Sequence, residues 1–395
     1  MNLSLIKKNY LKQFTLENWI FLTCFLLPTY LIGFSFFNLP INLWEIAVVI
    51  GFFWWLLGKR GSVSLKDIWI KYRKYFLPLG MISLGLIVST WLNGNYRTGL
   101  GIIKGWFVLP LLFLFISSEV LDEQKIKKLF QFFYFSALAV SIGAIFYWLS
   151  GQMTFDARLK SFFNSPNYLA MYLSPAIIIG LVLFRENKLF YSISLFLILL
   201  PFYFTYSLAA WVAVGVAALI IFFLSQRNNK KTLLVSGISL LILFSFVAFE
   251  LKYQKVESII SLDGRSSSAS RLMIWKTAEK LIQDNFLWGI GPGNFQNKYL
   301  EYQKFYPPYL EWAVPHPHNI FLAFWLYSGL IGLVGFLILL GVFFREFFIK
   351  QKSALKFMAL GIMLIILIHG LFDTTYFKND LAVIFWLAYL GMMKE

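Results

Sequence analysis

The stretch 189–224, LFYSISLFLILLPFYFTYSLAAWVAVGVAALIIFFL, decides the fold class because it contains no charged residue. An apolar run of this length exceeds the ~20 residues that cross the hydrocarbon core of a bilayer as one helix. Pro201 and the polar triplet Thr205-Tyr206-Ser207 predict a tight turn that divides the run into two spans, 189–204 and 207–224. One long bent helix is the alternative. The stretch predicts helices that cross a membrane.

Similar apolar runs recur along the whole chain. Hydrophobic residues make up 59% of the sequence and charged residues only 14%, against about 25% charged residues in soluble domains. We therefore expect one all-α polytopic membrane domain, 1–395, with about twelve transmembrane helices. The predicted spans lie near 19–38, 41–58, 76–92, 101–116, 126–149, 166–184, 189–204, 207–224, 232–250, 318–344, 355–371 and 380–394.

The basic residues predict how these spans are oriented. Lys and Arg gather in alternate short loops, such as 59–74, 125–128 and 345–356, which the positive-inside rule places in the cytoplasm. Both termini are then cytoplasmic and 250–317 forms a large extracytoplasmic loop. The net charge of +16 is explained by this pattern and by attraction to anionic lipid. Because no basic face forms, we do not expect a nucleic-acid partner.

Two details concern the first predicted span. It is too long for a signal-peptide core and lacks a small-x-small cleavage site, so we expect an uncleaved anchor. The single cysteine, Cys24, lies in this span and can form no internal disulfide bond.

The loop 250–317 contains an amphipathic helix in its middle. Residues 268–282 place Leu272, Trp275, Ala278, Leu281 and Ile282 on one face, and Ser268 or Ser270 is the expected N-cap. Arg271 falls in the first turn, where a cation opposes the helix dipole. This placement favours an anionic ligand for Arg271, with a solvated side chain as the alternative.

The same loop ends in His316-Pro317-His318-Asn319, which holds two of the three histidines of the chain. An imidazole at a membrane surface is suited to proton transfer near neutral pH. His318 is expected beside the start of the next helix, whose dipole favours the neutral form that a general base requires. The alternative is an interfacial histidine whose ring is hydrogen-bonded.

Further polar segments are expected on the outer face. In 158–167, Asn164 or Ser165 can cap a helix that begins at Pro166, but capping does not explain Arg158. Residues 289–295, Gly-Ile-Gly-Pro-Gly-Asn-Phe, follow a helix and not a strand, so we expect a turn and not a phosphate loop.

His369 and Asp373 form the last polar pair, at i and i+4, and we expect them to share a helix face. Ionisable residues inside a membrane are candidates for function. Asp373 could orient an imidazole or pair with an arginine on the outer face.

The outer segments contain no clustered carboxylates suited to Mg²⁺ and no His/Cys cluster suited to zinc. They also contain no serine in a nucleophile-elbow pattern. We expect no metal and no cofactor, and chemistry that uses Arg and His.

Several of these motifs together resemble the O-antigen ligase/O-antigen polymerase family, over roughly 155–375. The resemblance rests on the following segments of the sequence: 163–167, 205–211, 270–275, 289–295, His318-Asn319, 327–332 and 369–373. Leu208 is a departure, since the family often has Arg at this position.

The resemblance implies a metal-independent glycosyltransferase with a GT-C-like helical fold in the plasma membrane. It implies an undecaprenyl diphosphate-linked oligosaccharide as donor, and a glycan, a lipid A core or a protein hydroxyl as acceptor. Carried onto this chain, the essential residues are Arg158, Arg271 and His318. Asp373, His316 and Asn319 are supporting residues.

The alternatives are a membrane transporter or lipid-linked oligosaccharide flippase, and a non-catalytic glycan-binding membrane protein. Transporters usually show internal repeats and helices interrupted at the midplane. We find no repeat, and the polar motifs fall on one face. The motifs do not separate a ligase from a polymerase.

Overall fold

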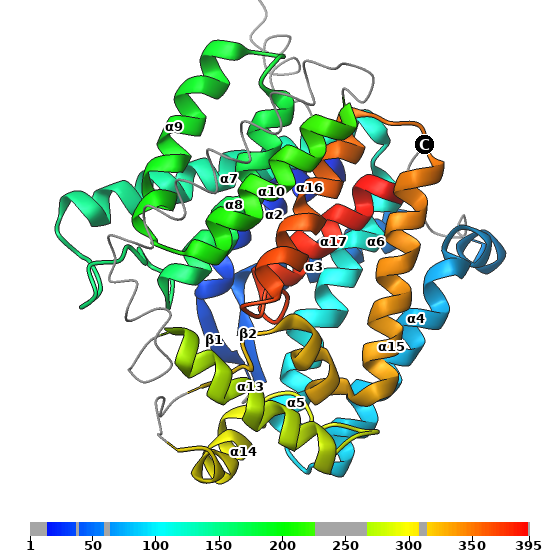
Figure 1. Cartoon of the computed structure of the whole chain (residues 1–395). Helices are drawn as coiled ribbons and strands as arrows, with labels where there is room; N and C mark the ends of the chain where they lie inside the picture. The colour runs from blue at the N-terminus through cyan, green and yellow to red at the C-terminus, as the bar shows by residue number, and fades with distance from the viewer. Residues whose placement is uncertain (1–13, 37–38, 59–63, 226–266, 308–313, 394–395) are drawn as a thin grey trace, which may run out of the picture.

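The computed structural model describes residues 14–36, 39–58, 64–225, 267–307 and 314–393. Figure 1 shows the long helices side by side in one bundle, with β1, β2, α5, α13 and α14 at one end and the C-terminus at the other. We call the first of these the α13 end. The predicted ninth span, 232–250, and parts of the loop 250–317 lie outside the described residues.

The described elements are nearly all helical. The α-helices are α2 Leu16–Phe25, α3 Leu43–Gly58, α4 Leu65–Leu92, α5 Tyr96–Ile103, α6 Leu109–Val120, α7 Glu123–Leu149, α8 Pro166–Leu183, α9 Lys188–Phe204, α10 Leu208–Ser225, α13 Ser267–Asp284, α14 Phe295–Tyr302, α15 Ile320–Ile349, α16 Ala354–Gly370 and α17 Asn379–Met393. A π-helical turn, Lys104–Val108, joins α5 to α6, and 3-10 turns cover Leu27–Leu31 and Gln303–Phe305. Strands β1 Gly33–Phe36 and β2 Leu39–Asn42 form an antiparallel hairpin.

The apolar helices agree with most of the predicted spans. Six of them are long and apolar enough to cross a membrane, and four shorter apolar helices accompany them among the described residues. They match every predicted span except the first and the ninth. The turn between 204 and 208 is confirmed, so the alternative of one bent helix is wrong. The total of twelve spans and the GT-C-like fold stay predictions.

The prediction of a continuous first span over 19–38 is wrong. Helix α2 ends at Phe25, a 3-10 turn with Pro28 near its start follows, and the chain then enters the hairpin β1–β2. Proline lacks an amide donor and its ring crowds the preceding helical turn, so Pro28 favours the end of α2 here, although α4, α8 and α9 each continue through a proline. The apolar composition did not predict the conformation of this segment.

Helix α15 is kinked at Gly329, which has φ 67° and ψ −176°. At the kink, backbone groups of α15 lack their partners within the helix, and the glycine-rich loop 289–293 and the preceding Leu287 form hydrogen bonds with them. The carbonyl of Leu326 accepts from the amides of Ile290 and Gly291 at 2.7 and 3.2 Å, and the amide of Leu330 donates to Leu287 at 3.0 Å. The backbone of residues 287–291 therefore supplies the hydrogen bonds that α15 lacks at its kink.

The prediction of a turn at 289–295 is confirmed. Gly289, Gly291 and Gly293 all have positive φ, a conformation that glycine adopts without steric cost. A Cβ at Gly291 would lie 3.0 Å from the carbonyl oxygen of Ser89 in α4. The loop needs glycine both for its own conformation and for this close approach.

Helix α13 confirms the predicted amphipathic helix, with two corrections. It begins no later than Ser267, so Ser268 and Ser270 lie inside the helix and do not cap it. The buried face contains Met273, Ile274 and Thr277 in addition to Ala278, Leu281 and Ile282, whereas Leu272 is exposed. The observed buried face is rotated relative to the predicted apolar face because α13 packs against the helices α14 and α15.

Candidate active site

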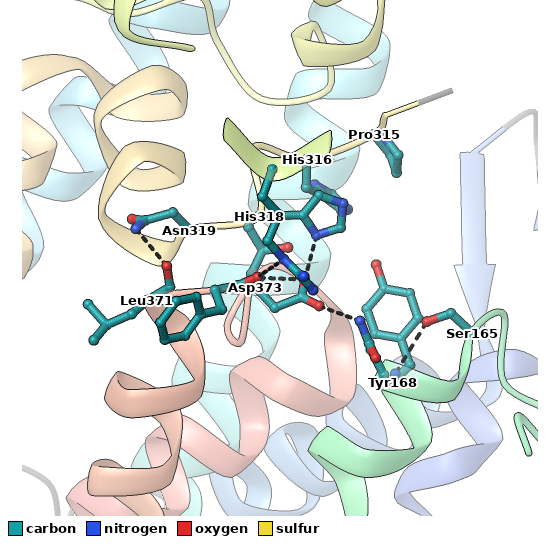
Figure 2. A network of polar contacts seen from close by, with 12 residues as sticks. Ser165, Tyr168, Pro315, His316, His318, Asn319, Leu371 and Asp373 are labelled. Carbon is teal, nitrogen blue, oxygen red and sulfur yellow. Dashed lines mark hydrogen bonds and ion pairs between the residues drawn. The ribbon is translucent and has the colours of Figure 1, made fainter. Parts of the chain in front are cut away.

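The segment that leads into α15 holds His318 in a fixed position. Asn319 is the N-cap of α15, and its side-chain oxygen accepts from the amides of Phe321 and Leu322 at 2.9 and 3.1 Å. Its side-chain nitrogen donates to the carbonyl of Leu371 at 3.0 Å (Figure 2). The sequence therefore placed His318 correctly beside the helix start.

The backbone of His318 itself is strained. Its φ is 47°, a left-handed conformation that is uncommon outside glycine and that persists only where the surroundings enforce it. Here Trp275 of α13 donates its indole N–H to the carbonyl of His318 at 3.3 Å. The Asn319 cap and this contact hold the backbone of His318 in this conformation.

The ring of His318 faces the carboxylate of Asp373. The distance from Nδ1 of His318 to Oδ1 of Asp373 is 3.0 Å, and Figure 2 shows the two side chains pointing toward one another. Burial alone would raise the pKa of Asp373. The hydrogen bond with His318, the charge of that ring when it is protonated and the charge of Arg271 together outweigh burial, so this pKa lies well below its ordinary value.

An ionised Asp373 selects the tautomer of His318. A carboxylate can only accept a hydrogen bond, so neutral His318 carries its proton on Nδ1 and leaves the lone pair of Nε2 available. The His318 side chain is 31% exposed, so a substrate can reach it. A histidine held by a buried carboxylate in this way is arranged as a general base.

Asn167 connects the Asp373 carboxylate to Arg158. Its side-chain nitrogen donates to Oδ2 of Asp373 at 2.9 Å, and its oxygen accepts from Nη2 of Arg158 at 2.7 Å. The guanidinium Nε donates to the carbonyl of Thr205 at 2.8 Å. Arg158, Asn167, Asp373 and His318 thus form one chain of contacts that crosses three separate parts of the sequence.

The loop that carries Arg158 is also strained. Ala157 and Ser161 have φ of 57° and 54°, and Tyr206, next to the carbonyl that Arg158 binds, has φ of 46°. With His318 these are the positive-φ residues other than glycine among the described residues, and all four lie in segments that build this site. Such strain clusters at functional sites, where the geometry matters more than its cost.

Arg271 approaches the same place from α13. Its Nε donates to the carbonyl of Phe372, next to Asp373, at 3.0 Å. Its charge contributes to lowering the pKa of Asp373 and of Arg158, although burial is the main cause of the lowered pKa of Arg158. The structure therefore brings together Arg158, Arg271, His318 and Asp373, the residues that the motifs singled out.

His316 has a different environment. Its Nδ1 lies 2.9 Å from the hydroxyl of Tyr327, which also donates to the carbonyl of Pro315 at 3.3 Å. Burial and the nearby His318 lower the pKa of His316 to about 4. A neutral ring bonded to tyrosine supports a structural role for His316 in the entry to α15.

The prediction that His369 and Asp373 share a helix face is wrong. Helix α16 ends at Gly370, and Asp373 lies in the loop beyond it. His369 is 1% exposed, and neither ring nitrogen has a hydrogen-bond partner among the described residues. The imidazole that Asp373 contacts is that of His318, because the turn after α16 directs the carboxylate toward the start of α15.

Two residues near this cluster were missed in the sequence. No role in the site was expected for Asn167, whereas Ser165 caps α8, as expected, by accepting from Tyr168 N at 3.3 Å. Because Ser165 already caps the helix, the amide of Asn167 is not needed for capping, and this was the signal in the sequence for another role. Lys378, for which no role was expected either, has its ammonium 3.7 Å from the centroid of the Tyr168 ring.

Among the described residues, no group of three or more His, Cys, Asp or Glu side chains could hold a metal ion. The absence of a cofactor stays a prediction.

These observations define a helical membrane protein with an Arg–Asn–Asp–His cluster at one end of its bundle. Residues 193–337 match the family described as O-Antigen ligase. The match confirms the resemblance for this part of the chain, which is similar to the O-antigen ligase family. It includes Arg271, His316, His318 and Asn319, whereas Arg158 and Asp373 lie outside it. No curated protein matches the chain.

Proposed function

We propose that this protein transfers a glycan from a polyprenyl diphosphate carrier to an acceptor hydroxyl on the outer face of the plasma membrane. The single observation that supports this most is the chain of contacts Arg158–Asn167–Asp373–His318. It connects Arg158, a cation that can bind phosphate oxygens, to His318, a base that can accept the proton of a hydroxyl. The family match supports the glycan as the transferred group.

In the proposed reaction the acceptor oxygen attacks the anomeric carbon of the donor sugar. A new carbon–oxygen bond forms while the bond to the diphosphate breaks, and the diphosphate leaves with the electron pair. The acceptor proton moves to Nε2 of His318, and Asp373 stabilises the resulting imidazolium through Nδ1. Asp373 remains ionised throughout.

Arg158 and Arg271 are assigned to the diphosphate. Diphosphate is a good leaving group, so catalysis needs neutralisation of its charge more than it needs an acid. Guanidinium binds phosphate oxygens with paired hydrogen bonds and stays charged. Arg158 is oriented for this role because Thr205 and Asn167 already hold two of its N–H groups.

The proposal is tested with purified protein in lipid nanodiscs, supplied with lipid-linked oligosaccharide and an acceptor. Formation of a glycosidic bond with release of the polyprenyl diphosphate is the expected result. Movement of the lipid-linked oligosaccharide across the bilayer without bond formation would instead identify a flippase. The glycan profile of a deletion strain separates the two enzymes: single repeats without long chains indicate a polymerase, and loss of all transfer to the acceptor indicates a ligase.

The proposed orientation has its own test. Single cysteines introduced in 285–310 are expected to react with an impermeant maleimide in intact cells. Cys24 is buried and contributes little background. Labelling that requires permeabilised cells would place the α13 end, and the proposed active site, in the cytoplasm.

A further inference from the structure

A second polar pocket opens at the α13 end, separate from the Arg158–His318 cluster. Its volume is about 420 Å³, and it lies between the hairpin β1–β2, the start of α3, helix α5 with the π-helical turn, and the start of α17. Its size falls within the ~300–1,000 Å³ of small-molecule sites. Neither the proposed mechanism nor the family match uses it.

The wall of this pocket is built around the buried carboxylate of Glu45, which is 3% exposed. One carboxylate oxygen lies 2.7 Å from the ammonium of Lys104, and the other accepts from the side-chain nitrogen of Asn379 at 3.3 Å. Side chains from α3, the π-helical turn and α17 therefore meet in one fixed polar surface.

The π-helical turn makes this surface possible. Lys104, Gly105 and Trp106 all belong to the turn and all line the pocket. A Cβ at Gly105 would lie 3.0 Å from the Glu45 carboxylate and 3.1 Å from the Asn379 amide. Such π-helical insertions are rare and frequently occur at functional sites.

The composition of the lining indicates the class of ligand. Amide, carboxylate and ammonium groups, which hydrogen-bond hydroxyls, lie beside the aromatic residues Tyr30 and Trp106. The ion pair of Glu45 with Lys104 neutralises both charges. Arg97 also lines the pocket and adds a guanidinium, whose N–H groups donate hydrogen bonds to hydroxyls. A ligand that is rich in hydroxyls and has apolar ring faces fits this surface best.

The aromatic residues also connect the pocket to the active site. The ring of Trp106 lies 6.0 Å from the ring of His316, centroid to centroid. Tyr30 and Tyr168 both lie against the ammonium of Lys378, at 5.3 and 3.7 Å from their centroids. A ligand in the pocket is thus one layer of side chains away from the residues that surround His318.

We infer that this pocket binds a mono- or disaccharide unit of the glycan substrate, remote from the bond that reacts. The choice of ligand rests on the proposed function. Binding energy from such a remote unit orients the reacting end. The unit belongs to the donor or to the acceptor, and the experiments below distinguish these two sources.

The first experiment measures protection of a cysteine. Thr98 lines the pocket and is exposed, and Cys24 is buried, so a Thr98→Cys variant presents a single reactive thiol. The probe is the free oligosaccharide released by mild acid from the surface polysaccharide of the host strain. We expect it to slow maleimide labelling of Thr98→Cys about fivefold or more at saturation. Inorganic phosphate should have no effect.

Tyr96→Cys is the matched control, because Tyr96 is exposed on the same helix but does not line the pocket. Its labelling should not change with oligosaccharide. Equal labelling of Thr98→Cys with and without oligosaccharide would overturn the inference. The Arg158→Ala and His318→Ala forms of Thr98→Cys should still be protected, so loss of transfer and loss of sugar binding are distinguishable.

The second experiment fills the pocket. A Cβ at Gly101, which lines the pocket, would find no atom nearer than Pro40 Cγ at 4.0 Å. Oligosaccharide binding should weaken from wild type to Gly101→Ser to Gly101→Phe, by about tenfold or more in the last. Gly80→Phe, on α4 with open space around its Cβ, should bind as wild type does. Equal affinity in the whole series would contradict the inference.

The same series identifies the source of the sugar. An increase in KM for the lipid-linked donor assigns the pocket to the donor glycan, and an increase for the acceptor assigns it to the acceptor. Unchanged KM for both in Gly101→Phe would overturn the inference. Thermal unfolding of each variant verifies that it is folded.

Discussion

Two loops meet helix α15 at the α13 end, and they do so in opposite ways. The segment 316–319 uses side chains: His318 contacts Asp373, and Asn319 caps the helix. The glycine-rich loop 289–293 uses its backbone, which bonds to the carbonyl of Leu326 at the kink. Both loops carry recognisable motifs, but one positions reactive groups and the other holds the scaffold in place.

This difference separates two consequences of substitution. Side chains of the first loop can be changed while the backbone stays where it is, so activity should fall before stability does. Glycines of the second loop have no side chain to lose. Any substitution there acts on the fold, and activity falls with it.

His318→Ala should give the largest loss of activity. Removing a general base lowers a rate by about 10²–10⁴-fold, whereas binding of the lipid-linked donor should persist because Arg158 and Arg271 remain. The measurements are kcat for transfer and the affinity for the donor. His316→Ala is the control and should retain most of the activity. The opposite order of the two variants would assign the base to His316, and equal severe losses would indicate that both rings act together.

Arg158→Lys and Arg271→Lys should lose nearly as much activity as the Ala variants. Lysine keeps the charge but lacks the planar fork that binds two oxygens. A hydrogen bond to a charged group contributes about 1.5–3 kcal/mol, so we expect a ~10-fold or larger loss in kcat/KM. Full activity of Arg271→Lys would show that only its charge is needed.

Gly291→Ala should act through stability. The substitution places a Cβ at φ 79°, and 3.0 Å from the carbonyl oxygen of Ser89, so the free energy of unfolding should fall by about 1–3 kcal/mol. Thermal unfolding in detergent measures the change. Gly341→Ala is the control, since its Cβ would meet nothing within 4 Å. If Gly291→Ala left stability unchanged but abolished transfer, the loop would belong to the active site and not to the scaffold.

The pH dependence of stability should give the smallest effect. Burial lowers the pKa of His316 from 6.5 to about 4, so the folded state favours the neutral ring. The stability from this preference is complete above pH 6.5 and is lost as the pH falls toward 4. We expect Tm to decrease over this interval, and to decrease less in His316→Gln. Identical slopes would show that His316 is not the group responsible. The lowered pKa of Asp373 adds a further loss only below its ordinary pKa of 3.8.

Most of the helices could be predicted from the sequence because an apolar run of sufficient length has no other stable state in lipid. A helix start was also predictable where the cap is local, as with Ser165. The prediction of the first span failed because hydropathy does not report where a helix ends, and this segment continues into a 3-10 turn and the hairpin β1–β2. The buried face of α13 failed because it depends on what the helix packs against.

For the active site, the sequence by itself determined which residue types are present: Arg158, Arg271, His318 and Asp373 stand out as polar groups beside apolar runs. Only the tertiary structure decided how they pair. It joined Asp373 to His318 and not to His369, it made Asn167 the bridge to Arg158, and it formed the pocket around Glu45. The reason is physical. Spans and caps depend on neighbours within a few residues, whereas these contacts depend on how helices distant in the sequence pack together.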